Sequence, residues 1–326
     1  MHRSALAHCG ALVVTAALAV LACACSSGSS AGGATPNDGG AGEATAREDG
    51  AGPADAASPD STASDGGPGD AGITDAHTVG DTAVGDGRWA LVWSDEFDED
   101  ASAPDPTKWT FTSLNTTTSG PGWGVEYDEQ AAAQVSGGLL TITATQAADG
   151  GVVSGAFDSK GKFQQAYGRF EARMKAPPGA GVWPAFWLMG DTNGTSWPTC
   201  GEIDIVEIVG SAPKNAYATV HSGNTSDPAQ NTSTGGVYTS ASADLSADFH
   251  VYAVEWSASK LDFYVDSELY ETIAPSTLTA GQLWAFDHAF YVMFDLAIGG
   301  SWAGPPSAST FPAPMVVDYV RVYTKG

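Results

Sequence analysis

The sequence predicts an all-β domain of two antiparallel sheets packed face to face, a sandwich of jelly-roll type, on three grounds. From about residue 88 to residue 326 the chain consists of short runs that alternate apolar and polar residues or are rich in β-branched ones. Clusters of Gly, Pro, Asn, Asp and Ser separate these runs. Long helical periodicity is hard to find, so helices are expected only as short turns.

Several segments carry the strand pattern clearly. YGRFEARMK, from Tyr167, alternates charged and apolar residues, as a half-buried strand does. KLDFYVDSELYET, from Lys260, predicts a hairpin that turns at Asp266 and Ser267. Strands are therefore expected most clearly within residues 138–146, 167–177, 250–273 and 315–324.

Two segments precede the globular part, residues 88–326. Residues 1–25 have a cationic start and an apolar run too short to span a bilayer, which predicts an export signal. The tetrapeptide VLAC resembles a bacterial lipobox ending at Cys23, with Cys25 as a second choice; ordinary cleavage and full secretion is the alternative. Residues 26–87 are Ala, Gly, Ser, Thr, Asp and Pro with almost nothing large and apolar, so a disordered tether is expected.

The globular part is acidic. Of the 38 acids and 13 bases in the chain, 11 acids and two bases lie before residue 88, which leaves 27 acids against 11 bases. Nucleic acids and sulfated polymers require Lys and Arg, so this balance disfavours both and favours a neutral partner. No feature demands an oligomer, and a monomer is expected.

Cys200 is the only cysteine of the globular part, because the other three lie in the export segment. A disulfide within that part is therefore excluded. No His stands nearby to activate the thiol, and its neighbours are strand-like, so a buried structural cysteine is expected. Spacings of His and Cys typical of zinc sites are absent.

Three carboxylates interrupt an apolar, β-branched run in the segment CGEIDIVEIVG. Glu202 and Asp204 are spaced for one face of a strand, whereas Glu207 is an odd number of residues further on. A β-bulge, in which Ile205 and Val206 together oppose one residue of the neighbouring strand, restores the phase. We therefore predict a bulged strand that turns all three acids into one cleft.

Two glutamates on such a strand can lean together until their carboxyls approach the ~5–5.5 Å of retaining glycoside hydrolysis. Glu202 would then be the nucleophile that forms a covalent glycosyl-enzyme. Glu207 would protonate the leaving oxygen and later deprotonate water, and Asp204 would hydrogen-bond to the nucleophile. The alternative is an exposed acidic edge strand that prevents aggregation, which the apolar flanks disfavour.

The tryptophans are the second feature, after the acidic strand, that indicates the kind of site. Indole faces suit the C–H faces of sugar rings, and Trp residues beside Gly or Pro near an acidic cluster favour a sugar cleft. The residues assigned to that cleft are Trp123, Trp183, Trp187, Trp197 and Trp302. The residues expected to pack in the core are Trp89, Trp93, Trp109 and Trp256.

These segments resemble glycoside hydrolase family 16, and within it the bacterial laminarinase-like endo-β-1,3-glucanases. The resemblance covers essentially all of residues 88–326, in family order, through LVWSDEFD, GKFQQAYGRFEARMKAPPGAGVWPAFWLMG, WPTCGEIDIVEIVG, ATVHSG and FDHAFYVMFDLAIGGSWAG. It implies a concanavalin-like jelly roll with a concave substrate cleft. It also implies a catalytic domain that hydrolyses internal β-1,3 linkages of laminarin-type or mixed β-1,3/1,4-glucan without a catalytic cofactor.

The resemblance also implies roles for individual residues. The three acids of the bulged strand would carry the retaining mechanism, and His221 would join Trp183 and Trp187 as a cleft residue. Many family members hold a structural calcium ion on the convex side, which here would be bound by Glu96 and Asp318. Carboxylate oxygens suit that hard cation.

The chain departs from the family pattern in three places. Glu126 is matched to a cleft residue after the GWG turn, where the family commonly has Asn residues and a Glu. Ala156 stands where an Arg is frequent, and Asp295 where Asn is common. These differences bear on fine subsite specificity and leave the carboxylate machinery unchanged.

Two alternative functions stay open at this point. One is a galactan hydrolase of the same family, such as an agarase or carrageenase, although sulfated carrageenan would require basic cleft residues that are scarce here. The other is a non-catalytic glucan-binding jelly roll. Loss of a catalytic acid would mark such a protein, and both Glu202 and Glu207 are present.

Overall fold

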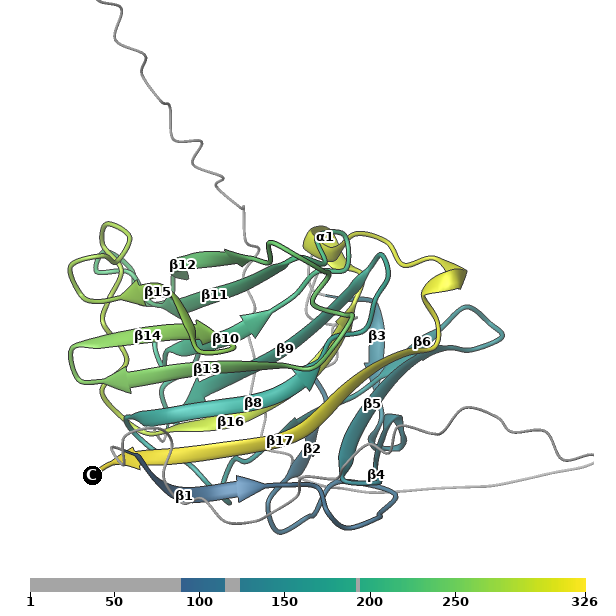
Figure 1. Cartoon of the computed structure of the whole chain (residues 1–326). Coiled ribbons are helices and arrows are strands. Elements are labelled where there is room, and N and C mark those ends of the chain that lie inside the picture. The colour runs from purple at the N-terminus through teal and green to yellow at the C-terminus, as the bar shows by residue number, and fades with distance from the viewer. Residues whose placement is uncertain (1–88, 115–123, 192–193) are drawn as a thin grey trace, which may run out of the picture. The chain divides into compact units, whose positions relative to one another are not determined.

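The computed structural model describes residues 89–114, 124–191 and 194–326, which form a sandwich of two sheets (Figure 1). The smaller sheet has seven strands in the spatial order β12-β11-β10-β9-β16-β7-β2. Its strands along the chain are β2 (Thr110–Thr112), β7 (Ala156–Asp158), β9 (Val182–Gly190), β10 (Glu202–Glu207), β11 (Asn215–Ser222), β12 (Thr232–Thr239) and β16 (Phe290–Ile298).

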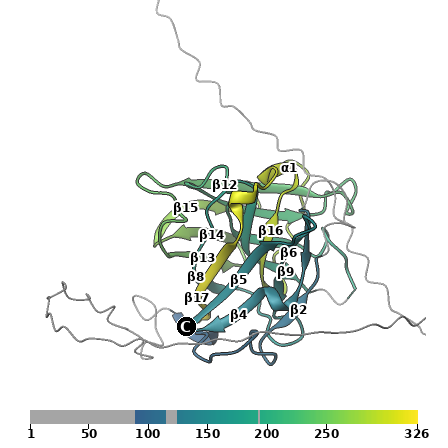
Figure 2. The same ribbon diagram turned by 90° about the vertical axis from the view of Figure 1, so that its right-hand side faces the viewer.

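The larger sheet has ten strands. Its main order is β15-β14-β13-β8-β17-β5-β6-β3, with β1 beside β17 and β4 beside β5 (Figure 2). All pairings are antiparallel except that of β3 with β6. The strands are β1 (Trp89–Asp95), β3 (Glu126–Asp128), β4 (Ala133–Ser136), β5 (Leu139–Gln146), β6 (Val152–Ser154), β8 (Gly168–Lys175), β13 (His250–Ser257), β14 (Lys260–Val265), β15 (Glu268–Ile273) and β17 (Ala313–Lys325).

This architecture confirms the predicted all-β sandwich. Helical structure in the described ranges is limited to α1 (Gly300–Ala303) and two 3-10 turns, Gln130–Ala132 and Ala308–Thr310. None of the helices in those ranges is long and apolar enough to cross a membrane. The predicted hairpin is also confirmed, because Asp266 and Ser267 join β14 to β15 with φ of 50° and 79°, the left-handed conformation of tight hairpin turns.

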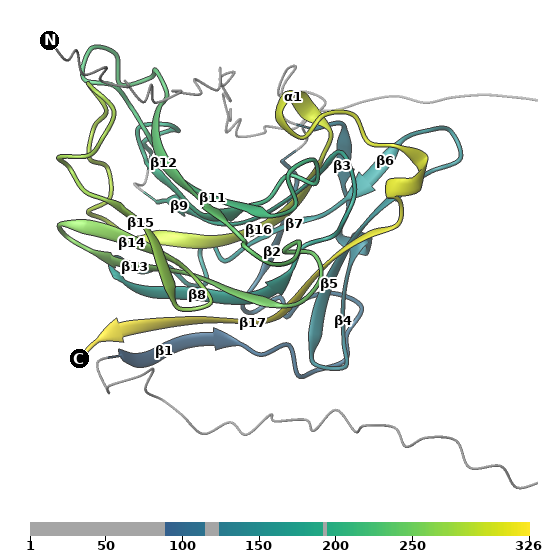
Figure 3. The ribbon, with the colours of Figure 1, turned by 45° about the horizontal axis from the view of Figure 1, so that its top comes forward.

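The core lies between the two sheets, which Figure 3 shows edge on. Phe170 and Met174 of β8 belong to the same buried cluster as Phe186 and Leu188 of β9. The charged residues that alternate with those of β8 point outward, as the pleat requires. The smaller sheet therefore rests on a closely packed base, which fixes the side chains on its opposite face.

The tryptophans predicted to pack internally do so. Trp89, Trp109 and Trp256 are buried, and Trp93 is half-buried with its ring stacked on Phe163, 4.7 Å between centroids. Trp256 of β13 reaches the other sheet, because its ring centroid lies 5.1 Å from that of Phe290 of β16. These four indoles serve packing, and so does that of Trp284, which packs against the core with its ring centroid 5.1 Å from that of Phe286.

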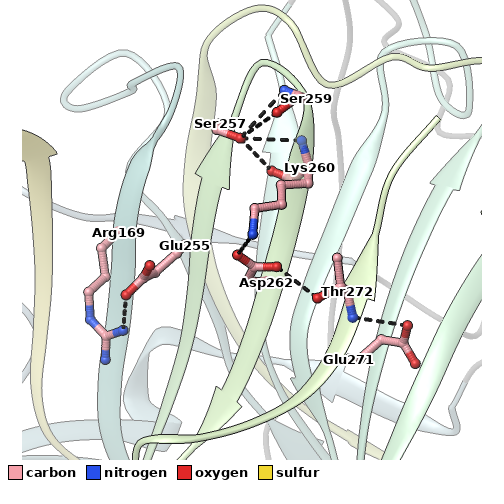
Figure 4. Close-up of polar contacts among 8 residues, drawn as sticks. All are labelled: Arg169, Glu255, Ser257, Ser259, Lys260, Asp262, Glu271 and Thr272. Carbon is pink, nitrogen blue, oxygen red and sulfur yellow. Dashed lines mark hydrogen bonds and ion pairs between the residues drawn. The ribbon is translucent and has the colours of Figure 1, made fainter. Parts of the chain in front are cut away.

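The outer face of the larger sheet carries charges in matched pairs (Figure 4). Arg169 lies 3.3 Å from Glu255, and Lys260 lies 2.6 Å from Asp262. Thr272 donates its hydroxyl to Asp262 at 2.8 Å. The acids of this face therefore have a cation or a donor beside them, which makes their role structural.

Candidate active site

Strand β10 contains the bulge that the sequence predicts. In its pairing with β9, Asp204 lies opposite Trp187 and Val206 lies opposite Phe186, so Ile205 is an extra residue in β10. The register with β11 shifts in the same interval. One inserted residue reverses which face the following side chains occupy. The odd spacing of the third acid is thereby corrected.

The bulge sorts the side chains of β10 between the core and a cleft. Ile203 and Val206 are fully buried in the core. Glu202, Asp204 and Glu207 line one cleft that opens to solvent. The remaining lining residues are Leu114, Glu126, Trp183, Ala185, Trp187, Asp295 and Ala297.

Glu202 is held from behind by groups that the cleft does not expose. The buried indole of Trp197 donates its N–H to Glu202 Oε2 at 2.6 Å. His221, on β11, lies directly opposite Glu202, and its Nε2 is 3.3 Å from Asp204 Oδ2. The other ring nitrogen, Nδ1, is 3.1 Å from the side-chain nitrogen of Asn231 and 3.2 Å from its oxygen. This support fixes the orientation of the carboxylate pair.

Glu207 has its own set of donors. The indole N–H of Trp183 donates to Oε1 at 3.0 Å, and the hydroxyl of Thr219 lies 3.5 Å from Oε2. Tyr217 of β11 lies opposite Glu207 in the sheet. Each of the two glutamates therefore receives one indole N–H, from tryptophans that belong to different segments.

Burial and mutual repulsion raise the pKa values of these acids. Burial, followed by the charge of Asp204, raises the pKa of Glu202 to about 8. Burial also raises the pKa of Asp204, and it raises that of Glu207 well above the ordinary value. Glu207 feels the charges of both Asp204 and Glu202. Glu207 therefore keeps its proton to a higher pH than an exposed glutamate does, as a general acid must.

Two further carboxyls line the same cleft. Asp295 of β16 accepts the indole N–H of Trp187 at 2.7 Å, and burial raises its pKa well above the ordinary value. Glu126 accepts backbone N–H groups of Ile298 at 2.8 Å and Val125 at 3.0 Å, while burial raises its pKa to about 7. Glu126 was assigned to the cleft from the sequence. Asp295 was noted only as a departure, because no local pattern shows that β16 lies beside β9.

Comparison with known proteins agrees with this geometry. The family model described as "Glycosyl hydrolases family 16" matches residues 121–321, most of the sandwich. The chain belongs to glycosyl hydrolase family 16. It is therefore a glycoside hydrolase, and the predicted family and fold are confirmed.

Individual relatives support the same assignment. A beta-glucanase from Rhodothermus marinus is 39% identical over 253 residues, which cover 72% of this chain and 85% of that protein. The laminarinase catalytic domain from Thermotoga maritima MSB8 superposes with a TM-score of 0.65 at 38% identity, covering 73% of this chain and 99% of that one. A keratan-sulfate endo-1,4-beta-galactosidase from Sphingobacterium multivorum is 33% identical over 251 residues, which cover 74% of this chain and 57% of that protein.

The remaining residues assigned to the family 16 cleft divide into four groups. Trp183 and Trp187 form part of the cleft wall. Trp302, which is 36% exposed, packs edge to face on Trp183 at 4.9 Å between centroids. Trp197 and His221 are buried behind Glu202 and support it instead of offering a sugar platform. The fifth tryptophan, at position 123, lies outside the described residues.

The residues predicted to bind calcium do not fit that ion as the structure places them. Glu96 accepts hydrogen bonds from Arg321, at 2.7 Å from Nη2 and 2.9 Å from Nε. Asp318 pairs with Arg173 at 2.6 Å. Each carboxylate is neutralised by a guanidinium, so neither is free to hold a cation, and the calcium site stays a prediction from resemblance.

A change at Asp204 should move the pH profile of this family 16 enzyme. The negative charge of Asp204 raises the pKa of Glu207. Asp204→Asn removes that charge, so Glu207 should lose its proton at lower pH, and the alkaline limb of kcat/KM should shift toward acid. Profiles of both proteins on laminarin would test this. An unmoved or alkaline-shifted limb would contradict the assignment of Glu207 as the acid.

Asp295→Asn should stabilise the protein at alkaline pH. Burial raises the pKa of Asp295 in the folded protein above its value of about 4 in the unfolded chain. Between these two pKa values the unfolded chain has already released this proton while the folded protein still holds it. The free energy of unfolding therefore falls as pH rises through this range. Asn removes the charge and still accepts the N–H of Trp187. Tm at pH 8 should rise by ~2–4 °C per kcal/mol gained, with little change at pH 4.

Asp262→Asn provides the matched control for that experiment, because Asp262 is paired with Lys260 on the outer face. Removal of the Asp262 charge should not raise Tm at pH 8 or at pH 4. An equal rise in both variants would show that the effect comes from lower net charge and has no connection with the cleft.

Proposed function

We propose that the protein is a retaining endo-β-1,3-glucanase that accepts laminarin-type or mixed β-1,3/1,4-glucan. The observation that carries this proposal is the bulge of β10, which turns Glu202 and Glu207 into one cleft with Asp204 between them. The names of the Rhodothermus and Thermotoga relatives support the substrate class. The acidic charge of the globular part suits a neutral polysaccharide.

The first chemical step uses the two glutamates together. Glu202 attacks the anomeric carbon of the sugar, and a covalent glycosyl-enzyme bond forms as the bond to the leaving oxygen breaks. Glu207 gives its proton to that oxygen, so the leaving sugar departs as a neutral alcohol. The N–H of Trp197 holds Glu202 Oε2, which leaves Oε1 available for attack.

The second step releases the product. Glu207, now ionised, removes a proton from a water molecule, and the water oxygen attacks the same anomeric carbon and displaces Glu202. Two displacements restore the original configuration. The raised pKa of Glu207 suits both steps, because a weak acid is a competent base once it has lost its proton.

The decisive experiment is release of reducing sugars from laminarin, lichenan, agarose and carrageenan by the purified protein. Turnover of laminarin with retention of configuration by proton NMR is the expected result. Inversion would reject the two-step mechanism. Inactivity on both glucans together with turnover of a galactan would overturn the substrate assignment.

A galactan hydrolase is the second candidate function. The similarity to the keratan-sulfate endo-1,4-beta-galactosidase favours it, because that relative covers the same part of this chain at 33% identity. Sulfated substrates require cations, and the cleft is lined by carboxyls and apolar groups. Unsulfated galactan is therefore the form of this alternative to test.

We also propose that the protein is exported and acts outside the cell, as a lipoprotein anchored at Cys23 or Cys25 or as a freely secreted monomer. The sequence of residues 1–25 supports export, and residues 26–87 have the composition of a tether. Intact mass of the mature protein distinguishes the three start sites. A mass that includes residues 1–22 would reject export processing.

A further inference from the structure

One acceptor in the catalytic cluster has no donor. Asp204 Oδ2 is buried and accepts no hydrogen bond from the described residues, although His221 Nε2 lies 3.3 Å away. Asn231 lies beside the opposite ring nitrogen of His221, Nδ1. An imidazole that donates its Nδ1 proton to Asn231 presents the lone pair of Nε2 to Asp204. In that tautomer the two facing lone pairs require a positive charge between them, either a proton or a metal ion.

Three side chains converge at this point. Ligand atoms of Glu202, Asp204 and His221 lie within 4.8 Å of one another, and all three residues are buried. Zinc bonds of about 2.0–2.2 Å in tetrahedral geometry place neighbouring ligands roughly 3.4 Å apart. The 3.3 Å between His221 Nε2 and Asp204 Oδ2 agrees with that edge.

The surroundings of the cluster resemble the outer shell of a metal site. Asn231 lies beside the ring of His221, and the indole N–H of Trp197 donates to Oε2 of Glu202. Hydrogen bonds of this kind fix the ligands of zinc in proteins. Three protein ligands would leave a fourth position open toward the cleft, where water could bind. On the outer face of the larger sheet, in contrast, Glu255 and Asp262 already have cations beside them (Figure 4).

We propose that Glu202, Asp204 and His221 bind a divalent transition-metal ion such as zinc, and that this ion and the substrate exclude each other. A mixed nitrogen and oxygen set of three ligands suits zinc or cobalt, whereas magnesium requires about six oxygen ligands. Exclusion follows because the metal would occupy Glu202. That second half of the proposal rests on the proposed role of Glu202 as the nucleophile.

Cobalt absorption tests the site directly, without turnover. Titration of the full chain with Co²⁺ should give visible bands of four-coordinate cobalt at one equivalent, which zinc displaces and magnesium does not. His221→Gln and Asn231→Ala should each weaken binding by about 10-fold or more. His250→Gln is the matched control, because His250 pairs with Asp266 outside the cleft, and it should bind cobalt as the parent does.

Two kinds of result would contradict the proposed metal site. Absence of the bands, or equal binding by the parent, His221→Gln and Asn231→Ala proteins, would overturn the site. Laminarin oligosaccharides should displace the cobalt; coexistence of both ligands would overturn the exclusion. Cobalt binding is measured from the absorption spectrum of the metal and does not depend on turnover. The experiment therefore tests the metal site even if the protein fails to hydrolyse laminarin, which separates this proposal from the proposed function.

Discussion

Glu202→Gln should abolish hydrolysis of laminarin, with a loss in kcat of about 10³-fold or more, while oligosaccharide binding persists. The amide keeps the shape of the carboxylate and can still accept the N–H of Trp197. It cannot form a glycosyl ester, so the first step loses its nucleophile. Single-turnover rates together with calorimetric binding of laminarin oligosaccharides measure the two properties separately.

The leaving group offers a sharper test of the same variant. An aryl glycoside with an acidic phenol needs no proton from the enzyme to depart, yet it still needs attack at the anomeric carbon. Glu202→Gln should therefore lose as much rate on such a substrate as on laminarin. Glu255→Gln, which alters an acid of the outer face, should leave both rates unchanged. A small loss for Glu202→Gln would remove it from the nucleophile role.

Glu207→Gln should lose about 10²–10⁴-fold in kcat on laminarin, because the leaving oxygen no longer receives a proton. On the activated aryl glycoside the rate of the first step should largely recover, because the phenol departs without a proton from the enzyme. The second step should stay slow, because the variant has no base to activate water. The covalent glycosyl-enzyme should therefore accumulate, and intact-protein mass spectrometry should detect it.

The two variants thus predict opposite patterns across the two substrates. Equal losses in the rate of the first step for Glu207→Gln on laminarin and on the activated glycoside would contradict its role as acid. Accumulation of a covalent adduct in Glu202→Gln would contradict the assignment of the nucleophile. The roles of the two glutamates would then be reversed, with Glu202 as the acid and Glu207 as the nucleophile.

The strand chemistry of this site could be predicted because it depends on local rules. Alternation along a pleat is strict, so the position of Glu207 required a bulge, and the register of β10 confirms it. The hairpin at Asp266 and Ser267 and the internal tryptophans followed from equally local patterns. Cys200 is a buried thiol, as predicted, although it lies in the turn before β10.

The rest depends on which strands become neighbours, and local patterns do not determine sheet order. Asp295 enters the cleft because β16 pairs with β9, which brings its carboxyl to the indole of Trp187. Trp197 precedes Glu202 closely in sequence, yet only the folded turn shows that its N–H supports the acid from behind. The acids suggested for calcium were paired with arginines from other strands, which spacing along the chain could not reveal.

Glu202 and Glu207 are the first and last residues of β10, which is paired on one side with β11 and on the other with β9. The spacing of these carboxyls is therefore set by paired strands and not by the connections at the rim, although the connection before β10 supplies the indole of Trp197. Insertions and deletions in those connections can therefore change which polymers enter, and how far along the groove they bind, while the reacting groups keep their spacing. A family with this architecture can change its substrate specificity through its loops while the arrangement of its reacting groups is kept.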